Sequence, residues 1–368
     1  MAAYFYAGND TVGAHVRRIL DAAGWFAEDI VEDAEVVITY FTSTTALEDA
    51  YFRTDGIVKR AASRALLVDL SPTTPTFARE LSAVAMVNDL RPVEAPIVVL
   101  DTAVEDAFAS IENIACFVAG EKADIDDATA VLELLAGNAQ ITGAAGSAQM
   151  ARAALSVQVA AQIVAAIEAD ALFRAVQNDP ASEIELEGRA GAASPHADQV
   201  LSAVAEKRFS GTYTVEMFIG ELAAAMSTAD DIDLVLPQLE ACMRVLELLA
   251  VIGGVDMAPS ALALLYREEE EVREAGLDWS RAADYYSTDA HLDDEDDEFY
   301  EDNYDAPYDF DDYDDYAGHD HECGCDHDHD HSHDHECDCG HDHGHEHAHD
   351  HECGCGHDHG HSHQHGCC

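Results

Sequence analysis

The sequence is poor in basic residues. Lysine and arginine together number 18 against 74 aspartates and glutamates, and no basic residue lies beyond Arg281. Because 28 of the acidic residues follow Tyr286, the part of the chain before this point and the part after it each carry a net charge of −28. Both parts would repel a polyanion. The composition therefore argues against binding to nucleic acid.

Long apolar runs are also missing. No segment reaches the ~18 uninterrupted apolar residues that a membrane span requires. The first residues, MAAYFYAGNDTVGAHVRRIL, lack the basic start and the long apolar run of a secretory signal. We therefore expect a cytoplasmic protein that does not bind membranes. Cysteine is scarce before residue 323, and Cys116 and Cys242 are expected in the interior of a strand and a helix, respectively.

Short β-branched runs alternate with helical patterns in the first part of the chain. The runs AAYFYA, EVVITYF and ALLVDL are typical of buried strands, and TVGAHVRRILDAAG, TALEDAYFRTDGIVKRA and PTFARELSAVAMV are typical of helices. The same alternation continues through NIACFVAG and AQIT to about Gly143. Strands and helices at this spacing predict a parallel α/β sheet. We assign residues 1–145 to a shortened, Rossmann-like α/β domain.

The strand patterns stop at Ser147. A long alanine-rich run, SAQMARAALSVQVAAQIVAAIEADALFRAVQ, places apolar residues at helical spacing, and further helical patterns follow through Ala275. The segment PASEIELEGRAGAASPH is expected to be a loop. We therefore predict an all-α domain over residues 146–287. Clustered acidic residues then predict a disordered linker over residues 288–318, and residues 319–368 repeat a short unit rich in histidine and cysteine.

Several motifs occur in an order that resembles one enzyme family. They are VVITYFTS, LLVDLSPTTPTFARELS, EAPI, AGSAQMARAAL, RFSGTY and ALALLYREE. Over roughly residues 3 to 285 this order resembles the β-hydroxyacid dehydrogenases, the group of 3-hydroxyisobutyrate dehydrogenase and 6-phosphogluconate dehydrogenase. The resemblance implies a Rossmann domain joined to a helical domain, a nicotinamide cofactor, a small hydroxy acid as substrate, and dimers formed through the helical domain.

The turn that would bind the cofactor departs from the family pattern. The Gly-x-Gly-x-x-Gly motif corresponds to Gly8 and Gly13, with Asp10 in place of the middle glycine. A carboxylate there adds bulk and a repelling charge where the backbone would approach the pyrophosphate. Ser71 keeps a family-like identity, although a strand end before a helix N-cap explains it equally well. We regard these four residues as a vestigial cofactor site, which puts NAD(P) binding in doubt.

Two further segments depart from the family. Only eleven residues separate Gly24 from Val36, too few for the strand, the helix and the acidic ribose ligand of the family. The family's substrate loop, Asp-Ala-Pro-Val-Ser-Gly-Gly, corresponds to residues 94–100, which read EAPIVVL. Branched apolar side chains replace the hydroxyl and both glycines that would hold a carboxylate. We therefore expect neither a normal ribose site nor a normal substrate site.

The proton-transfer position is also changed. The catalytic lysine of the family corresponds to Arg152, and its polar partner four residues later corresponds to Ser156. Arginine stays protonated, so that it can bind an anion but is poorly suited to shuttle a proton at neutral pH. A second family lysine falls near Gly220 and Glu221 in a looser correspondence. We therefore expect Arg152 to occupy the catalytic position without catalytic activity.

Residues 319–368 form a candidate metal-binding tail. They hold 18 histidines and 8 cysteines, and a His-Glu-Cys-x-Cys unit occurs three times. Imidazole suits Zn, Ni and Cu, and thiolate adds a preference for Zn and Cu(I). At four ligands per ion, the tail could hold about six ions. The candidate ligands are His319, His321, Cys323, Cys325, His327, His329, His331, His333, His335, Cys337, Cys339, His341, His343, His345, His347, His349, His351, Cys353, Cys355, His357, His359, His361, His363, His365, Cys367 and Cys368.

These observations leave two main hypotheses. In the first, the chain is a catalytically degenerate hydroxyacid-dehydrogenase-like scaffold whose tail stores Ni or Zn, or delivers it to a metalloenzyme client. In the second, the chain is an atypical NAD(P)-dependent oxidoreductase that acts on a small hydroxy acid, and the tail is an accessory metal buffer. A third hypothesis makes the body only a dimerisation platform. We expect a homodimer in each case.

The tail predicts metal binding that depends on pH. Full-length protein should bind several Ni²⁺ or Zn²⁺ ions, with an affinity that falls as the pH drops through about 6.5, because protons compete for imidazole. A chain ending at residue 318 serves as the control in a calorimetric titration. Equal stoichiometry in the two chains would rule out the tail as the metal site.

Overall fold

The computed structural model describes residues 2–283. The predicted acidic linker and all 26 candidate metal ligands of the tail lie outside the described residues, so that both assignments stay predictions.

An eight-stranded sheet forms the first part of the chain, as the alternating patterns predict. Its order is β2-β1-β3-β4-β5-β7-β6, and β8 pairs with β7. The first five strands are parallel, whereas β7 runs antiparallel to β5 and β6 and parallel to β8. The all-parallel prediction therefore fails at β7 and β8, which both run opposite to the first five strands. The strands are β1 (Ala3–Gly8), β2 (Phe26–Ala27), β3 (Val36–Tyr40), β4 (Leu66–Asp69), β5 (Arg91–Glu94), β6 (Ile97–Val99), β7 (Ile114–Gly120) and β8 (Asn138–Gly143).

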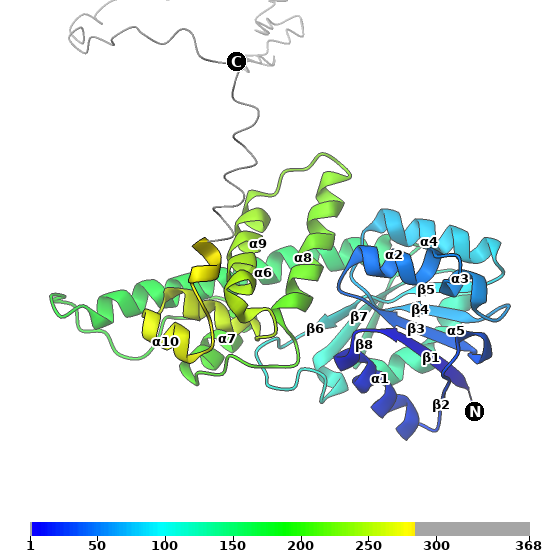
Figure 1. Ribbon diagram of the computed structural model, residues 1–368, viewed down its shortest axis with the longest axis horizontal. Coiled ribbons are helices and arrows are strands. Elements are labelled where there is room, and N and C mark those ends of the chain that lie inside the picture. Colours follow the sequence, from blue (N-terminus) through cyan, green and yellow to red (C-terminus); the bar gives the residue numbers. More distant parts are fainter. Residues whose placement is uncertain (1, 284–368) are drawn as a thin grey trace, which may run out of the picture. The chain divides into compact units, whose positions relative to one another are not determined.

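Helices cover both faces of this sheet. In Figure 1, α2, α3 and α4 lie on one side of the strands, and α1 and α5 lie on the other. Two clusters of buried apolar side chains correspond to these two faces, one around Leu47, Leu67 and Leu81, and the other around Val16 and Ile38. The elements are α1 (Asp10–Ala22), η1 (Val31–Asp33), α2 (Thr44–Phe52), α3 (Ile57–Arg60), α4 (Pro75–Val87), η2 (Ile111–Asn113) and α5 (Lys122–Leu135).

The second part of the chain is helical, as the loss of strand patterns predicts. The segment after α6 is a loop until α7 begins at Pro195, in agreement with the prediction for PASEIELEGRAGAASPH. Side-chain caps begin two of these helices, α7 and α8. The hydroxyls of Ser194 and Thr214 accept hydrogen bonds from backbone N–H groups in the first turn of each helix. The elements are α6 (Ser147–Asn178), α7 (Pro195–Ala205), α8 (Val215–Asp230), α9 (Pro237–Leu249), η3 (Ala250–Gly254), η4 (Pro259–Tyr266) and α10 (Glu269–Glu274).

Helix α6 connects the two parts of the fold. Among the described helices, it alone is long and apolar enough, by length and composition only, to cross a membrane. The segment of α9 with η3 and the following η4 pass the same test only together, as a pair bent by 85°. Half of the most apolar window of α6 is buried inside the protein, as in the core helix of a soluble protein. Its first turn follows β8 directly, so that its N-terminus lies at the carboxyl end of the sheet. The candidate site is located there.

Candidate functional site

The turn between β1 and α1 is built around Gly8. Its φ angle is +129°, and a Cβ atom added there would lie 1.9 Å from the carbonyl oxygen of Tyr40. Glycine is therefore required for β1 and β3 to approach this closely. Gly13 has a related role, because a Cβ atom there would lie 2.5 Å from the Tyr6 ring. The two glycines that the sequence retains are thus explained by packing between the first strands and α1.

The donors at the N-terminus of α1 are bonded within the turn itself. The side-chain oxygen of Asn9 accepts hydrogen bonds from the backbone of Thr11 at 3.0 Å and of Val12 at 3.2 Å. Asp10 occupies the first helical position with its carboxylate. In a dinucleotide-binding turn these donors and the positive end of the helix face the pyrophosphate. Here the Asn9 side chain already accepts hydrogen bonds from two of these backbone N–H groups, and Asp10 adds a negative charge in the first turn of the helix. The turn therefore does not fit a pyrophosphate.

The segment that would bind the ribose is reduced to a fragment. Strand β2 has only two residues, and they pair with Ala3 and Tyr4 at the start of β1. A single 3₁₀ turn, η1, replaces the helix that would connect β2 to β3. Since Gly8 lies four residues beyond Tyr4, the end of β2 falls short of the cofactor turn by roughly 13 Å. The short spacing thus leaves a two-residue strand and a single 3₁₀ turn between α1 and β3.

Arg152 lies in the second turn of α6 and is 4% exposed. It forms an ion pair with Glu221 of α8, which is equally buried, and it donates hydrogen bonds to the carbonyl oxygen of Ile97 and the hydroxyl of Ser156. Burial alone would lower the pKa of the Arg152 guanidinium, but the Glu221 carboxylate together with Tyr213 and Tyr40 outweighs burial and raises it. Arg152 therefore stays charged and cannot exchange a proton at neutral pH.

Two tyrosines complete the surroundings of this pair. Tyr40 at the end of β3 is 1% exposed and Tyr213 before α8 is 2% exposed. Burial raises the pKa of both phenols, and the charge of Glu221 raises it further. Helix α8 also lies directly on the end of β3, because a Cβ atom at Gly220 would be 2.4 Å from the carbonyl oxygen of Thr42. Arg152 is thus enclosed by packed side chains and by backbone.

Ser71 takes part in a separate network at the end of β4. Its hydroxyl donates to Asp69 at 2.6 Å and accepts from the backbone of Phe41 at 3.0 Å. The hydroxyl of Thr39 donates to the same Asp69 oxygen at 2.8 Å. The side chain of Gln149, from α6, bonds to the backbone of Ser71. Ser71 therefore joins neighbouring strands, which is the structural role that its sequence context allows.

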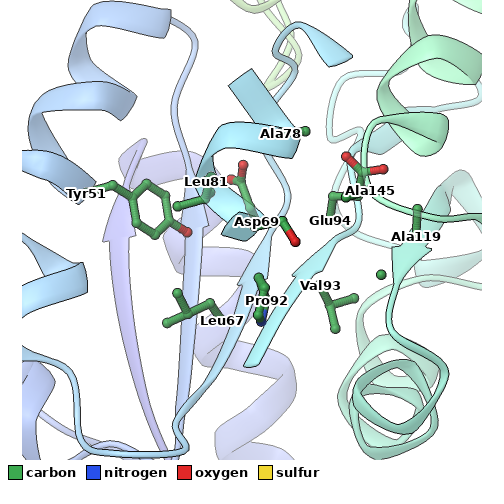
Figure 2. Close-up of a pocket in the computed structure, with 12 residues that line it drawn as sticks. Tyr51, Leu67, Asp69, Ala78, Leu81, Pro92, Val93, Glu94, Ala119 and Ala145 are labelled. Atoms are coloured by element: carbon green, nitrogen blue, oxygen red, sulfur yellow. The ribbon is translucent and has the colours of Figure 1, made fainter. Parts of the chain in front are cut away.

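Glu94 is the candidate residue that sequence analysis undervalued. It ends β5, and its Oε1 accepts hydrogen bonds from the backbone of Gly146 at 2.8 Å and Ala148 at 3.0 Å, at the start of α6. Its Oε2 is buried and has no hydrogen-bond partner among the described residues. Figure 2 shows Glu94 and Asp69 beside a small cavity of about 20 Å³, lined largely by apolar side chains such as Leu81. Such a cavity has room for about one water molecule.

Burial raises the pKa of both carboxyls. The pKa of Glu94 rises to about 7, and that of Asp69 rises to about 6 even though Ser71 and Thr39 donate to it. Asp69 also contributes to the shift of Glu94 through its charge. Groups that titrate near neutrality can exchange protons. The sequence signal was a carboxylate placed inside an otherwise apolar strand end, in LLVDL and in PVEAPI.

The remaining predicted positions fall into clear environments. Val98 and Val99 are buried in β6, so that the segment corresponding to the substrate loop forms a strand. Cys116 in β7 and Cys242 in α9 are buried, as predicted. An isolated histidine in a helical pattern is expected on the helix surface, but His15 is buried at 6% exposure, with Nδ1 2.9 Å from the carbonyl oxygen of Phe108. No group of three or more His, Cys, Asp or Glu suited to a metal ion occurs within residues 2–283.

The buried ion pair predicts a large stability effect from a small change. Glu221→Gln leaves the Arg152 charge buried without its partner, and should lower the free energy of unfolding by about 3–5 kcal/mol. The matched control is Glu32→Gln, which breaks the exposed pair with Arg60 and should change stability little. Urea unfolding measures both. Similar small losses in the two variants would contradict the assignment of a tightly enclosed pair.

Glu94 predicts a stability that falls with rising pH. Its pKa is about 7 in the folded protein against an ordinary value of 4.5, so that the folded state binds more protons between these values. The contribution is complete below pH 4.5 and is lost as the pH rises through 7, at most about 3 kcal/mol. In Glu94→Gln the decline of unfolding free energy between pH 5 and 7 should be shallower than in the wild type, whereas the exposed control Glu112→Gln should keep the wild-type slope. An unchanged slope in Glu94→Gln would refute this assignment.

Comparison with known proteins supports the predicted fold. Residues 9–146 match the NAD binding domain of 6-phosphogluconate dehydrogenase. The uncharacterized oxidoreductase YkwC of Bacillus subtilis (strain 168) is 24% identical over 239 residues, which is 65% of this chain and 81% of that protein. Of the two functional hypotheses, these likenesses favour the oxidoreductase.

Solved structures agree with the same architecture. A 3-hydroxyisobutyrate dehydrogenase from Salmonella typhimurium superposes with a TM-score of 0.56 at 16% identity, over 72% of this chain and 99% of that one. The Mycobacterium tuberculosis 3-hydroxyisobutyrate dehydrogenase, solved with L-serine, gives a TM-score of 0.57 at 22% identity, over 73% of this chain and 100% of that one. The described chain therefore has the fold of the 3-hydroxyisobutyrate dehydrogenases, an α/β domain that matches an NAD-binding domain followed by a helical part.

Proposed function

We propose that the described chain is a hydroxyacid-dehydrogenase-like scaffold that does not carry out hydride transfer. The observation that supports this proposal is the buried pair of Arg152 and Glu221. The sequence resemblance aligns Arg152 with the family's catalytic lysine. A proton-transfer group must reach its substrate and must exchange a proton near neutral pH. Arg152 meets neither requirement, because it is enclosed and permanently charged.

The cofactor turn supports the same proposal independently. Asn9 takes two of the backbone donors at the start of α1, and Asp10 adds a negative charge at the same place. A nicotinamide dinucleotide would have to displace the Asn9 side chain from these donors, and its pyrophosphate would lie close to the Asp10 carboxylate. The residues present do not fit the cofactor.

The comparisons favour a second candidate, an atypical NAD(P)-dependent oxidoreductase that acts on a small hydroxy acid. In this alternative the site opens when it binds ligands, and a residue other than lysine transfers the proton. Glu94 is the described group best suited to that role by its pKa of about 7, although its carboxylate faces the start of α6. The binding of Ni or Zn by the tail belongs to both candidates and rests on the sequence alone.

Cofactor binding and turnover separate the two candidates. The wild-type protein should show no saturable binding of NADH or NADPH at micromolar concentration, and no oxidation of 3-hydroxyisobutyrate with either cofactor. The Mycobacterium tuberculosis enzyme serves as the positive control. Arg152→Lys alone should not create activity, because a restored acid or base contributes about 10²–10⁴ in rate only when cofactor and substrate are already positioned.

The opposite result would establish the second candidate. That result is wild-type turnover that Glu94→Gln changes in its pH profile, while the exposed control Glu112→Gln does not. Tight binding of NADH without turnover would also overturn the argument from the cofactor turn. Circular dichroism of each variant confirms that a loss of activity does not reflect a loss of fold.

A further inference from the structure

Two buried carboxyls lie next to each other on the sheet. Asp69 at the end of β4 and Glu94 at the end of β5 are partners in the register of these parallel strands. Neighbouring strands lie about 4.8 Å apart, and register partners point to the same face of the sheet. Both side chains line the cavity of about 20 Å³ in Figure 2, and they are 4% and 8% exposed, respectively. Within residues 2–283 neither forms an ion pair with a basic residue.

Each of these carboxyls has one oxygen that accepts hydrogen bonds and a second oxygen that does not. Within the described residues, every hydrogen bond to the Asp69 carboxyl reaches Oδ1. Both hydrogen bonds to Glu94 reach Oε1, from the start of α6, whereas Oε2 is buried without a partner in this part of the chain. A buried polar atom without a partner is costly, so that Oε2 requires one.

The size and the lining of the cavity indicate what this partner is. A space of about 20 Å³ holds one water molecule and excludes a larger ligand. A divalent cation takes about six oxygen ligands, whereas the cavity offers two carboxyls and the hydroxyls of Tyr51 and Ser82. The Tyr51 hydroxyl is already 2.7 Å from that of Thr39. A water molecule needs only two to four polar partners, which the carboxyls can supply.

We propose that one water molecule occupies this cavity and bridges Oε2 of Glu94 to the Asp69 carboxyl, so that the two carboxyls share one proton. In the exchange, Oε2 gives its proton to the water oxygen while the water gives one of its own protons to Asp69. The water is unchanged, and the pair keeps one negative charge. The proposal does not depend on whether the protein retains dehydrogenase activity.

Two adjacent charges in an apolar cavity repel each other, which favours this shared state. Burial raises the pKa of Glu94 to about 7, and the charge of Asp69 raises it further. The other titratable groups that face the pair are Tyr51 on α2 and Arg79 on α4. Burial raises the pKa of the Tyr51 phenol well above its ordinary value, so that it stays neutral. Arg79 is exposed, and its charge opposes the rise in the pKa of Glu94 only in part. The lining residues from β7 carry no charge.

Amide variants distinguish a shared proton from two independent ones. Glu94→Gln and Asp69→Asn each keep an oxygen that can accept the existing hydrogen bonds and remove only the charge, so that both should fold. In the infrared spectrum of the full chain, a protonated carboxyl gives a carbonyl band that a carboxylate lacks. The difference between the wild type and Glu94→Gln isolates the proton that depends on Glu94 and gives its pH midpoint. The exposed control Glu112→Gln should show no such difference near neutral pH.

We expect this midpoint to fall by about one pH unit when the same difference is measured in the Asp69→Asn background. This is a tenfold weaker affinity for the proton, because the neighbouring negative charge is gone. An unchanged midpoint would show two independent carboxyls and would overturn the proposal.

The water is tested by filling the cavity. Ala78 of α4 lines the cavity, and Ala78→Val adds two methyl groups there. Losing the water should raise the midpoint of Glu94 by about one pH unit, because the ionised form loses its hydrogen-bond partner. Ala83→Val makes the same change at an exposed position of the same helix and should keep the wild-type midpoint. Circular dichroism of both variants checks the fold.

An unchanged midpoint in Ala78→Val would show a dry cavity and would overturn the proposal. A wild-type midpoint that differs between sodium chloride and tetramethylammonium chloride would assign the cavity to a monovalent cation, and would overturn it as well.

Discussion

The arrangement of the site depends on one buried ion pair. Removing Arg152 and Glu221 from water is costly, and the cost is offset only when each charge is paired and its remaining hydrogen-bonding groups are satisfied. Ile97, Ser156 and the partner carboxylate meet this condition for Arg152. They belong to β6, α6 and α8, so that the pair ties the end of the sheet to two helices. A lysine at position 152 would have a single charged group where the arginine now reaches three partners.

Other polar groups at the carboxyl end of the sheet also form their hydrogen bonds within the protein. The backbone donors at the start of α1 are bonded to Asn9, those at the start of α6 to Glu94, and the hydroxyl of Ser71 to Asp69. In an enzyme of this architecture, such groups are the ones that a ligand uses. Here they are matched mainly to one another. Ligand binding would therefore have to exchange existing hydrogen bonds for new ones, with little net gain.

Much of the fold could be predicted because the patterns are local. The helix α4 has the bounds of the run PTFARELSAVAMV, and Pro180 in the sequence comes just after the end of α6. The antiparallel direction of β7 could not be predicted, because a strand's pattern carries its burial and not its direction. The burial of His15 was missed for a related reason, since its partner Phe108 lies 93 residues away.

The sequence could identify which residues of the site depart from the expected types, but it could not predict the contacts that these residues make. Asp10 and Arg152 could be identified by position, because each stands where a particular residue type has a known physical role. That Asn9 closes the turn, or that Glu221 rather than solvent neutralises Arg152, depends on side-chain directions and on the approach of α8 to β3. These are long-range packing outcomes. The pKa shift of Glu94 likewise follows from its depth in the fold, which the strand end PVEAPI only suggests.

The apolar clusters of the fold reach the candidate site, because Ile97, Tyr40 and Tyr213, which surround Arg152, belong to the larger cluster. The smaller cluster, around Leu67, packs the other face of the sheet. Since stability comes chiefly from apolar burial, these clusters supply most of it without a ligand. The hydrogen bonds of Asn9 and Glu94 to the starts of α1 and α6 satisfy backbone donors that would otherwise need a ligand or water. Stability without a ligand is the physical condition that the proposed scaffold role requires.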